Sequence, residues 1–484
     1  MGQAISMAAI YCCCSAGSSL CNSCFGTVAV GTTGRKRSVL LLALVIATAL
    51  WFQYDVGPSI VSGQGWIWKI SKIVPGTNLV HGAWSDSCEA KYPNASEGVI
   101  EDCAGNAGVY RPTFLSTLYF MANAVATKFS PTLNREAWPA KYALLAFGLL
   151  LTVFVPNGPL FVGFYLWLAR IGAALFVVLQ QVILIDVAYN WNDDWVEKAN
   201  ESDRLSFGSG SGWLHAIVGV CVSLYLACLT SIGFLYKHYT GGDSSQEYYD
   251  DDTSCAGNTW VITLTLLGII GITALQLLGT SDGSLLTSGV ISLYAVYLCF
   301  TIVSKNPKGA CNPRLGENDV WGITIGLLLT TVSLIWTGWS WSAEPRLMNA
   351  DSLQSARAVL PENPSSSSDA AEAPLDLDVP LMDGEEAVTS GMVTTHTNST
   401  ARESASLAQV WKLNVVLALI SCYVAMILTG WGTIDAIDQD THNAANPTVG
   451  RVNMAILGIS QWLALLLYAW TLVAPLLFPD REFS

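Results

Sequence analysis

Charged residues and the motifs of soluble catalysis are both scarce in this sequence. Only 12% of its 484 residues are charged, whereas a soluble chain carries roughly a quarter. There is no Walker loop, no dinucleotide-binding fingerprint and no HExxH pair, and none of the five histidines stands in a recognisable nucleophile setting. A net charge of −14 without a basic stripe also disfavours nucleic acid. We therefore expect no enzyme, no metal or other cofactor, and no nucleic-acid partner.

Long apolar runs are abundant instead. Hydrophobic residues make up 52% of the chain, and the mean hydropathy is +0.43. A bilayer core of about 30 Å needs about 20 mostly apolar residues in a helix. The sequence thus predicts an all-α integral membrane protein with about ten transmembrane helices. They are expected over 38–54, 112–127, 139–155, 159–190, 213–236, 258–278, 285–304, 318–341, 409–431 and 450–478.

The basic residues suggest how the chain is oriented. The first long apolar run follows Arg35-Lys36-Arg37, and no small-residue cleavage site comes soon after it, so a signal peptide is not expected. Ten spans put both termini on one side. With this topology, 13 of the 23 Lys and Arg residues lie on that side and nine on the other. Because positive charge favours the cytosolic face, cytosolic termini are predicted.

The chain divides into five parts on this basis. Residues 1–37 form a cytosolic, Cys-rich segment, and 38–341 contain the first eight helices. Residues 342–408 hold 11 acidic against three basic residues, a composition that favours a disordered cytosolic loop. Residues 409–478 contain the last two helices, and 479–484 form a cytosolic tail.

Four of the 13 cysteines fall in loops on the far side of the membrane: Cys88, Cys103, Cys255 and Cys311. An oxidising compartment favours disulfides. The predicted pairs are Cys88–Cys103, inside one loop, and Cys255–Cys311, which would join the loop after the fifth helix to the loop after the seventh. Sequence alone does not settle connectivity, and free loop cysteines are the alternative.

Two kinds of covalent modification are indicated. Asn94 begins the one glycosylation sequon on the far side. Gly2 stands in a myristoylation pattern, and Cys12, Cys13 and Cys14 are candidates for palmitoylation near the membrane. A short apolar segment that dips into the membrane is the alternative for this N-terminal region.

The helix predicted over 159–190 is unusual in length and polarity. Its 32 residues would span roughly 48 Å at 1.5 Å per residue, so it must tilt or project from a core of about 30 Å. Arg170 and Gln181 are eleven residues apart and share a face. A polar side chain at membrane depth usually faces a partner or a polar cavity. The candidate residues for a polar path are Arg170, Gln180, Gln181, Asp186 and Asn190; interhelical hydrogen bonds and snorkelling are the structural alternative.

Several motifs in this order resemble the serine incorporator (Serinc) family. They are the cysteine cluster from Cys12 to Cys24, Arg170-Ile-Gly-Ala, Leu184-Ile-Asp-Val-Ala-Tyr-Asn-Trp-Asn-Asp-Asp-Trp195, Ser292-Leu-Tyr-Ala-Val-Tyr, Cys311-Asn-Pro-Arg-Leu315 and Phe478-Pro-Asp-Arg-Glu-Phe-Ser484. The resemblance covers essentially the whole chain. It implies ten helices in two four-helix bundles around a long diagonal cross-member, for which the helix at 159–190 is the natural candidate. The chain departs from the family at Lys412-Leu413-Asn414 and at Leu428-Thr-Gly-Trp431.

The resemblance also implies a link to phosphatidylserine and sphingolipid metabolism, and three functions compete. In the first, the protein scrambles phospholipids passively, with headgroups passing along the five candidate residues; a guanidinium such as that of Arg170 holds phosphate by two parallel hydrogen bonds. In the second, it carries or presents L-serine to lipid-synthesising enzymes, although paired unwound helices that would favour a carrier site are not evident. The third is a scaffold without transport. Membrane phospholipids are the expected partners, in the endomembrane system or plasma membrane, and an oligomer is compatible with the sequence.

Overall fold

The computed structural model describes residues 33–62, 77–91, 97–134, 137–205, 210–241, 255–278, 284–308, 311–313, 320–340, 410–432 and 447–477. Within these ranges every regular element is helical, and no strand occurs. The elements are α2 (Thr33–Trp51), η1 (Phe52–Val56), α3 (Gly57–Val61), α5 (Thr77–Lys91), α6 (Glu97–Phe129), η2 (Pro131–Asn134), α7 (Trp138–Val153), η3 (Leu160–Tyr165), α8 (Leu166–Leu205), α9 (Ser211–Tyr239), α10 (Ala256–Leu278), α11 (Leu285–Val303), α12 (Val320–Ser340), α15 (Val410–Leu428), η5 (Gly430–Gly432) and α16 (Pro447–Leu477).

The all-helical architecture predicted from the sequence is confirmed. Among the described residues, seven helical stretches are long and apolar enough to cross a membrane: Arg37–Val61, Gly163–Arg204, Ser211–Tyr239, Ala256–Leu278, Leu285–Val303, Val410–Leu428 and Gly450–Ala474. The apolar helices Trp138–Val153 and Trp321–Trp336 are shorter. The remaining expected span, 112–127, lies inside α6, whose first half is rich in charged residues. The count of ten spans therefore stays a prediction.

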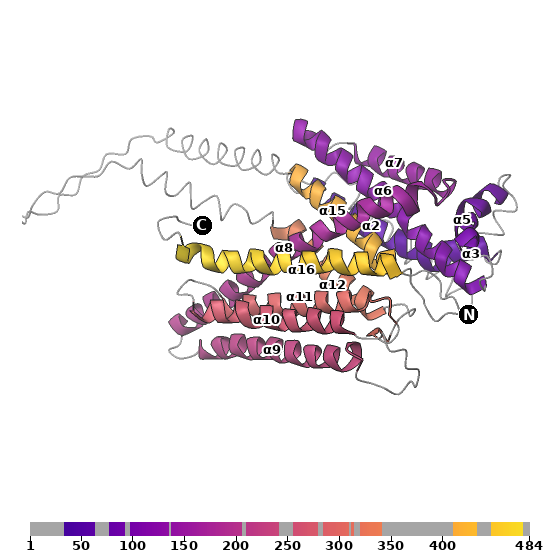
Figure 1. The fold of residues 1–484 in the computed structure, drawn as a ribbon. Coiled ribbons are helices and arrows are strands. Elements are labelled where there is room, and N and C mark those ends of the chain that lie inside the picture. Colours follow the sequence, from indigo (N-terminus) through magenta and orange to yellow (C-terminus); the bar gives the residue numbers. More distant parts are fainter. Residues whose placement is uncertain are drawn as a thin grey trace, which may run out of the picture.

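The helices pack in two sets. In the first, α15 packs against α6, and α6 also contacts α2, α3, α5 and α7. In the second, α11 packs against α9, α10 and α16. The long helix α8 contacts α15 of the first set and α9, α11 and α16 of the second, and Figure 1 shows it crossing obliquely between them. This placement suits the expected cross-member, while the pair of four-helix bundles remains a prediction.

The outer surface of the helices differs from that of a soluble protein, because it exposes many large apolar side chains. The interior helices α11 and α15 are buried along most of their length. The outer helices leave large apolar side chains exposed, among them Leu150, Val218, Leu229, Leu267 and Leu466. Contiguous apolar surface on this scale is rare on a soluble monomer. It is the surface expected of helices that face lipid.

Helix α6 is longer than the sequence suggested. The predicted span began at residue 112, but α6 starts at Glu97 and continues through Pro112. Proline removes one helical hydrogen bond and crowds the preceding turn, so tertiary packing has to hold the segment before it. The backbones of α3 and α6 meet closely there: a Cβ atom on Gly57 would come within 2.7 Å of the Cα atom of Gly105. Hydropathy does not detect this contact, because the segment is too polar to be read as a span.

Helix α8 also extends beyond its predicted end. The span was expected to stop at Asn190, whereas α8 continues to Leu205 after the π-helical turn η3. At 1.5 Å per residue, its 40 residues cover roughly 60 Å. The added residues are largely charged or polar, so a criterion based on apolarity stops too early.

Candidate functional site: the two faces of α8

The predicted path residues divide between two opposite faces of α8. Arg170, Gln180 and Gln181 are buried, with exposed fractions of 3%, 0% and 2%. Asp186 and Asn190 are exposed. This division follows from the helical repeat, because Arg170 and Gln181 lie three turns apart on one side and Asp186 lies well around from them. The structure therefore does not bring the five side chains together along one surface.

Arg170 lies where α8, α15 and α16 meet. Its Nη2 atom makes a long hydrogen bond of 3.4 Å to the carbonyl oxygen of Trp431, and its guanidinium carbon lies 5.1 Å from the ring centroid of Trp167. Trp431 follows the end of α15 with a φ of 65°, in the left-handed region. Asn453 of α16 donates to the same carbonyl at 2.7 Å. Since carbonyl groups at a helix C-terminus lack intrahelical partners and favour cations, this one oxygen joins three helices.

The two glutamines on the buried face bond to different neighbours. The hydroxyl of Tyr294 in α11 lies 3.3 Å from Oε1 of Gln180 and 2.9 Å from the carbonyl oxygen of Val177. The Nε2 atom of Gln181 donates to the carbonyl of Ala464 in α16 at 2.9 Å. Hydrogen bonds of this kind stabilise helix association where no water competes. Through these hydrogen bonds and that of Arg170, the buried face of α8 is joined to α11, α15 and α16.

The exposed face of α8 changes from apolar to polar along its length. Ile171, Leu175 and Val182 are exposed at intervals of four and seven residues, which keeps them on one side of the helix. Asp186 and Asn190 continue the same side. One helix surface therefore offers apolar contact over several turns and polar atoms after it.

Asp186 is held by two partners. Its Oδ2 atom accepts a hydrogen bond from Nε1 of Trp336 in α12 at 2.6 Å, and its Oδ1 atom accepts one from Nδ2 of Asn190 at 3.1 Å. Further along α8 is a polar cleft of about 640 Å³, lined by Asp193, Val196, Glu197, Asn200, Glu201 and Arg204. The polar end of the exposed face thus leads to a second polar surface on the same helix.

Arg111 is a buried cation that the sequence analysis missed. It is fully buried, and its three guanidinium nitrogens each donate at 3.1 Å to carbonyl oxygens, those of Thr152, Ala107 and Val155. The guanidinium carbon also lies 3.7 Å from the ring centroid of Trp84. Arg111 stands directly before Pro112, at the expected edge of a span, where a charged residue does not indicate burial. If the sequence had been read as a helix that continues upstream of Pro112, Arg111 would have been expected inside the protein.

Both predicted disulfides are present. Cys88 bonds to Cys103 between α5 and α6. Cys255 bonds to Cys311, which joins the start of α10 to the segment after α11. The prediction that these four loop cysteines form two disulfides, Cys88–Cys103 and Cys255–Cys311, is therefore confirmed.

Other expectations are not decided by this structure. No group of three or more His, Cys, Asp or Glu side chains in the described ranges could hold a metal ion. Gly2, Cys12, Cys13, Cys14 and Asn94 lie outside the described residues, as do residues 342–408 and 479–484. Their modification, the disorder of the acidic loop and the cytosolic placement of the termini remain predictions.

Comparison with known proteins decides the family. A profile described as serine incorporator (Serinc) matches residues 10–481. The chain belongs to the serine incorporator family. The family resemblance expected from the motifs is thereby confirmed, and it spans nearly the whole chain.

Individual serine incorporators are distant from this member of the family. A probable serine incorporator of Nematostella vectensis is 27% identical over 420 residues, which cover 81% of this chain and 84% of the relative. Serine incorporator 3 of Bos taurus is 25% identical over 411 residues, covering 78% and 80%. Serine incorporator 2 of Homo sapiens is 24% identical over 432 residues, covering 82% and 84%. The full-length match supports a common helical architecture with considerable change in side chains.

Proposed function

We propose that this serine incorporator family member lets phospholipids cross passively between membrane leaflets along the exposed face of α8. The observation that carries the proposal is the change of that face from apolar, at Ile171 to Val182, to polar, at Asp186 and Asn190. A crossing phospholipid keeps its acyl chains in hydrocarbon while its headgroup needs polar partners. Because an unpaired polar group in an apolar medium costs several kcal/mol, a surface with both characters lowers the barrier to crossing.

The polar end of this face has the chemistry to hold a headgroup. The Asp186 carboxylate carries more acceptor sites than Trp336 and Asn190 occupy, so it can accept a hydrogen bond from a headgroup amine. Arg170 and Gln181 lie on the opposite, buried face of α8, where their hydrogen bonds hold the helix against its neighbours. Direct contact of these two side chains with a headgroup requires the helix packing to open, because both are almost completely buried.

The alternatives make different demands. A serine carrier must move a free amino acid, and the relatives are named for serine incorporation. A scaffold moves neither substrate. Passive scrambling needs no nucleotide site, which suits a sequence without a Walker loop. The three functions therefore differ in the molecule that crosses the membrane, which is a phospholipid for the scramblase, serine for the carrier and neither for the scaffold.

The full-length protein in proteoliposomes tests the proposal. A phosphatidylethanolamine with a fluorophore on one acyl chain, and hence a free headgroup amine, should become accessible to an external quencher from both leaflets, while the same vesicles should not accumulate radiolabelled L-serine. Replacing Asp186 and Asn190 together by Leu should slow scrambling roughly five- to tenfold, the effect of losing one hydrogen bond in the rate-limiting state. Serine accumulation without scrambling would show that the protein is a serine carrier. The absence of both fluxes would favour the scaffold.

A matched control comes from α9. Ser223 and Thr230 are exposed polar residues on this lipid-facing helix, so replacing both by Leu makes a comparable change away from α8. This control should scramble at the unaltered rate. An equal slowing in both double variants would contradict a specific path on α8.

A further inference from the structure

The carboxylate of Asp186 forms no ion pair with a basic side chain in the described part of the chain. Its two partners, Nε1 of Trp336 and Nδ2 of Asn190, are both neutral donors. By contrast, Asp194 of the same helix pairs with Lys198. The neighbouring helix α12 contains no charged residue. Since a carboxylate has about four acceptor positions, Asp186 can still bind a cation.

The basic residues of α8 lie away from this carboxylate. Arg170 is on the opposite, buried face. The next basic residue after Asp186 is Lys198, twelve residues further along the helix, which is roughly 18 Å. Charges separated by more than about 10 Å are largely screened at ordinary salt concentrations. Asp186 therefore gives this part of the exposed face a local negative charge.

The carboxylate is also within reach of a lipid. Asp186 is exposed and follows Val182 by one helical turn on the same side of α8. The Val182 side chain is 51% exposed, so it offers apolar contact next to the charge. A phospholipid with its acyl chains along the apolar turns would bring its headgroup to Asp186.

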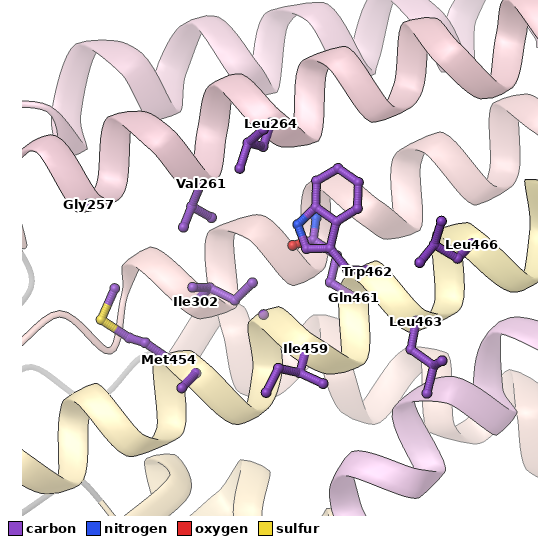
Figure 2. Close-up of a pocket in the computed structure, with 12 residues that line it drawn as sticks. Gly257, Val261, Leu264, Ile302, Met454, Ile459, Gln461, Trp462, Leu463 and Leu466 are labelled. Atoms are coloured by element: carbon purple, nitrogen blue, oxygen red, sulfur yellow. The ribbon is translucent and has the colours of Figure 1, made fainter.

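The groove between α10 and α16 offers no comparable charge. It has a volume of about 630 Å³, and Figure 2 shows that its walls consist mostly of apolar side chains. None of the described residues that line it is charged. The amide nitrogen of Gln461 already donates to Thr265 and to the carbonyl oxygen of Ala295. This groove therefore cannot select headgroups by charge, whereas the exposed face of α8 can.

We propose that Asp186 makes the lipid path on α8 selective for phospholipids whose headgroup contains a protonated amine. The ammonium group donates to the carboxylate, and the opposite charges strengthen this hydrogen bond. A headgroup with phosphate but no ammonium group is repelled by the same carboxylate. One residue thus favours the first class of lipid and disfavours the second. The inference rests on the proposed function and assigns its substrate class.

Two lipids that differ only at the headgroup nitrogen test this selectivity. Acyl-labelled phosphatidylethanolamine is compared with its N-acetyl derivative, each in trace amount in phosphatidylcholine vesicles that contain the full-length protein. Acetylation removes the positive charge and keeps the phosphate, the acyl chains and the label. After subtraction of the rate in protein-free vesicles, the free amine should be scrambled about tenfold faster, the factor of one charge-assisted hydrogen bond.

Variants of Asp186 separate its charge from its packing. Asp186→Asn keeps an oxygen acceptor for Trp336 and removes the charge. The ratio of the two rates should therefore fall from about tenfold to about one. Asp186→Glu keeps the charge, displaced by one methylene, and should retain part of the ratio. Asp194→Asn is the matched control, because Lys198 already neutralises the charge that it removes; it should keep the full ratio.

The outcomes distinguish this selectivity from the function on which it rests. Both lipids are measured on the same preparation, so a partly unfolded variant lowers both rates and leaves their ratio unchanged. Equal rates for the two lipids in the unaltered protein would overturn the selectivity and leave scrambling in place. An undiminished ratio in Asp186→Asn would overturn the role of Asp186. If the unaltered protein scrambles neither lipid, the proposed function fails and the selectivity fails with it.

Discussion

At the scale of single residues, backbone carbonyls are the main partners of the buried cations. Arg111 binds three of them, two at the end of α7 (Thr152 and Val155) and one within α6 (Ala107), and Arg170 binds one just after α15. Within a membrane protein interior a charge without a partner is costly. Carbonyl groups at helix C-termini carry partial negative charge and are otherwise unsatisfied. Each arginine therefore satisfies at least one carbonyl group at a helix end, and it joins distant parts of the chain.

The first prediction concerns Arg170. Arg170→Leu should lower the free energy of unfolding by about 1.5–3 kcal/mol, because the charge-assisted bond to the Trp431 carbonyl is lost. Scrambling should fall together with the thermal unfolding midpoint in detergent. Asn453→Leu, which removes the other donor to this carbonyl, should behave alike. Slower scrambling with an unchanged midpoint would instead assign Arg170 to direct headgroup contact.

The second prediction concerns Arg111. Arg111→Met should destabilise the protein by more than about 3 kcal/mol, since it leaves the carbonyls of Thr152 and Val155 without this donor. Arg111→Lys should recover only part of the loss, because an ammonium group cannot reproduce the guanidinium fork. Thermal unfolding of both variants measures the difference. Equal stability of Lys and Arg at this position would show that charge alone matters.

At the scale of elements, helices extend wherever packing supports them, whether or not they are apolar. α6 continues through Pro112 because its earlier half lies against α3 and α5. Covalent links add to this packing at one end of several helices. Cys255 anchors the start of α10, and Asn258 in its first turn donates to the carbonyl of Cys311 at 2.9 Å. Cys311, in the segment after α11, is therefore held to the first turn of α10 by both a disulfide and a hydrogen bond.

The third prediction concerns this covalent link. Replacing Cys255 and Cys311 together by Ser should lower the free energy of unfolding by about 4 kcal/mol, the chain-entropy value for a separation of 56 residues. The same treatment of Cys88 and Cys103, 15 residues apart, should cost about 3 kcal/mol. Thermal unfolding with and without reductant measures both. Non-reducing peptide mapping that finds these thiols free would contradict the pairings.

At the scale of the whole molecule, α8 connects two sets of helices that otherwise pack mainly within themselves. Its buried face bonds to α11, α15 and α16, while its other face bonds to α12 through Asp186 and leaves Ile171, Leu175 and Val182 exposed. A long helix with ties on one side and free surface on the other can serve as both support and lipid path.

The fourth prediction concerns topology. If ten spans place the termini in the cytosol, Asn94 is the one sequon that meets the glycosylation machinery. Asn94→Gln should therefore remove any mobility shift produced by endoglycosidase. A shift that persists and needs Asn200 or Asn398 would contradict the orientation or the number of spans.

The sequence by itself determined the helical membrane class, the family, the existence of an overlong polar helix and the shared side of four loop cysteines, whose pairing the structure then decided. Each rests on local pattern: apolar length, ordered motifs, helical periodicity and the side of a loop. Tertiary structure alone decided that Arg170, Gln180 and Gln181 are buried while Asp186 and Asn190 face outward, because periodicity separates faces without saying which neighbour covers them. It also decided that Arg111 and Gln461 are buried. Their environment depends on packing between segments far apart in the chain, and no local pattern records it.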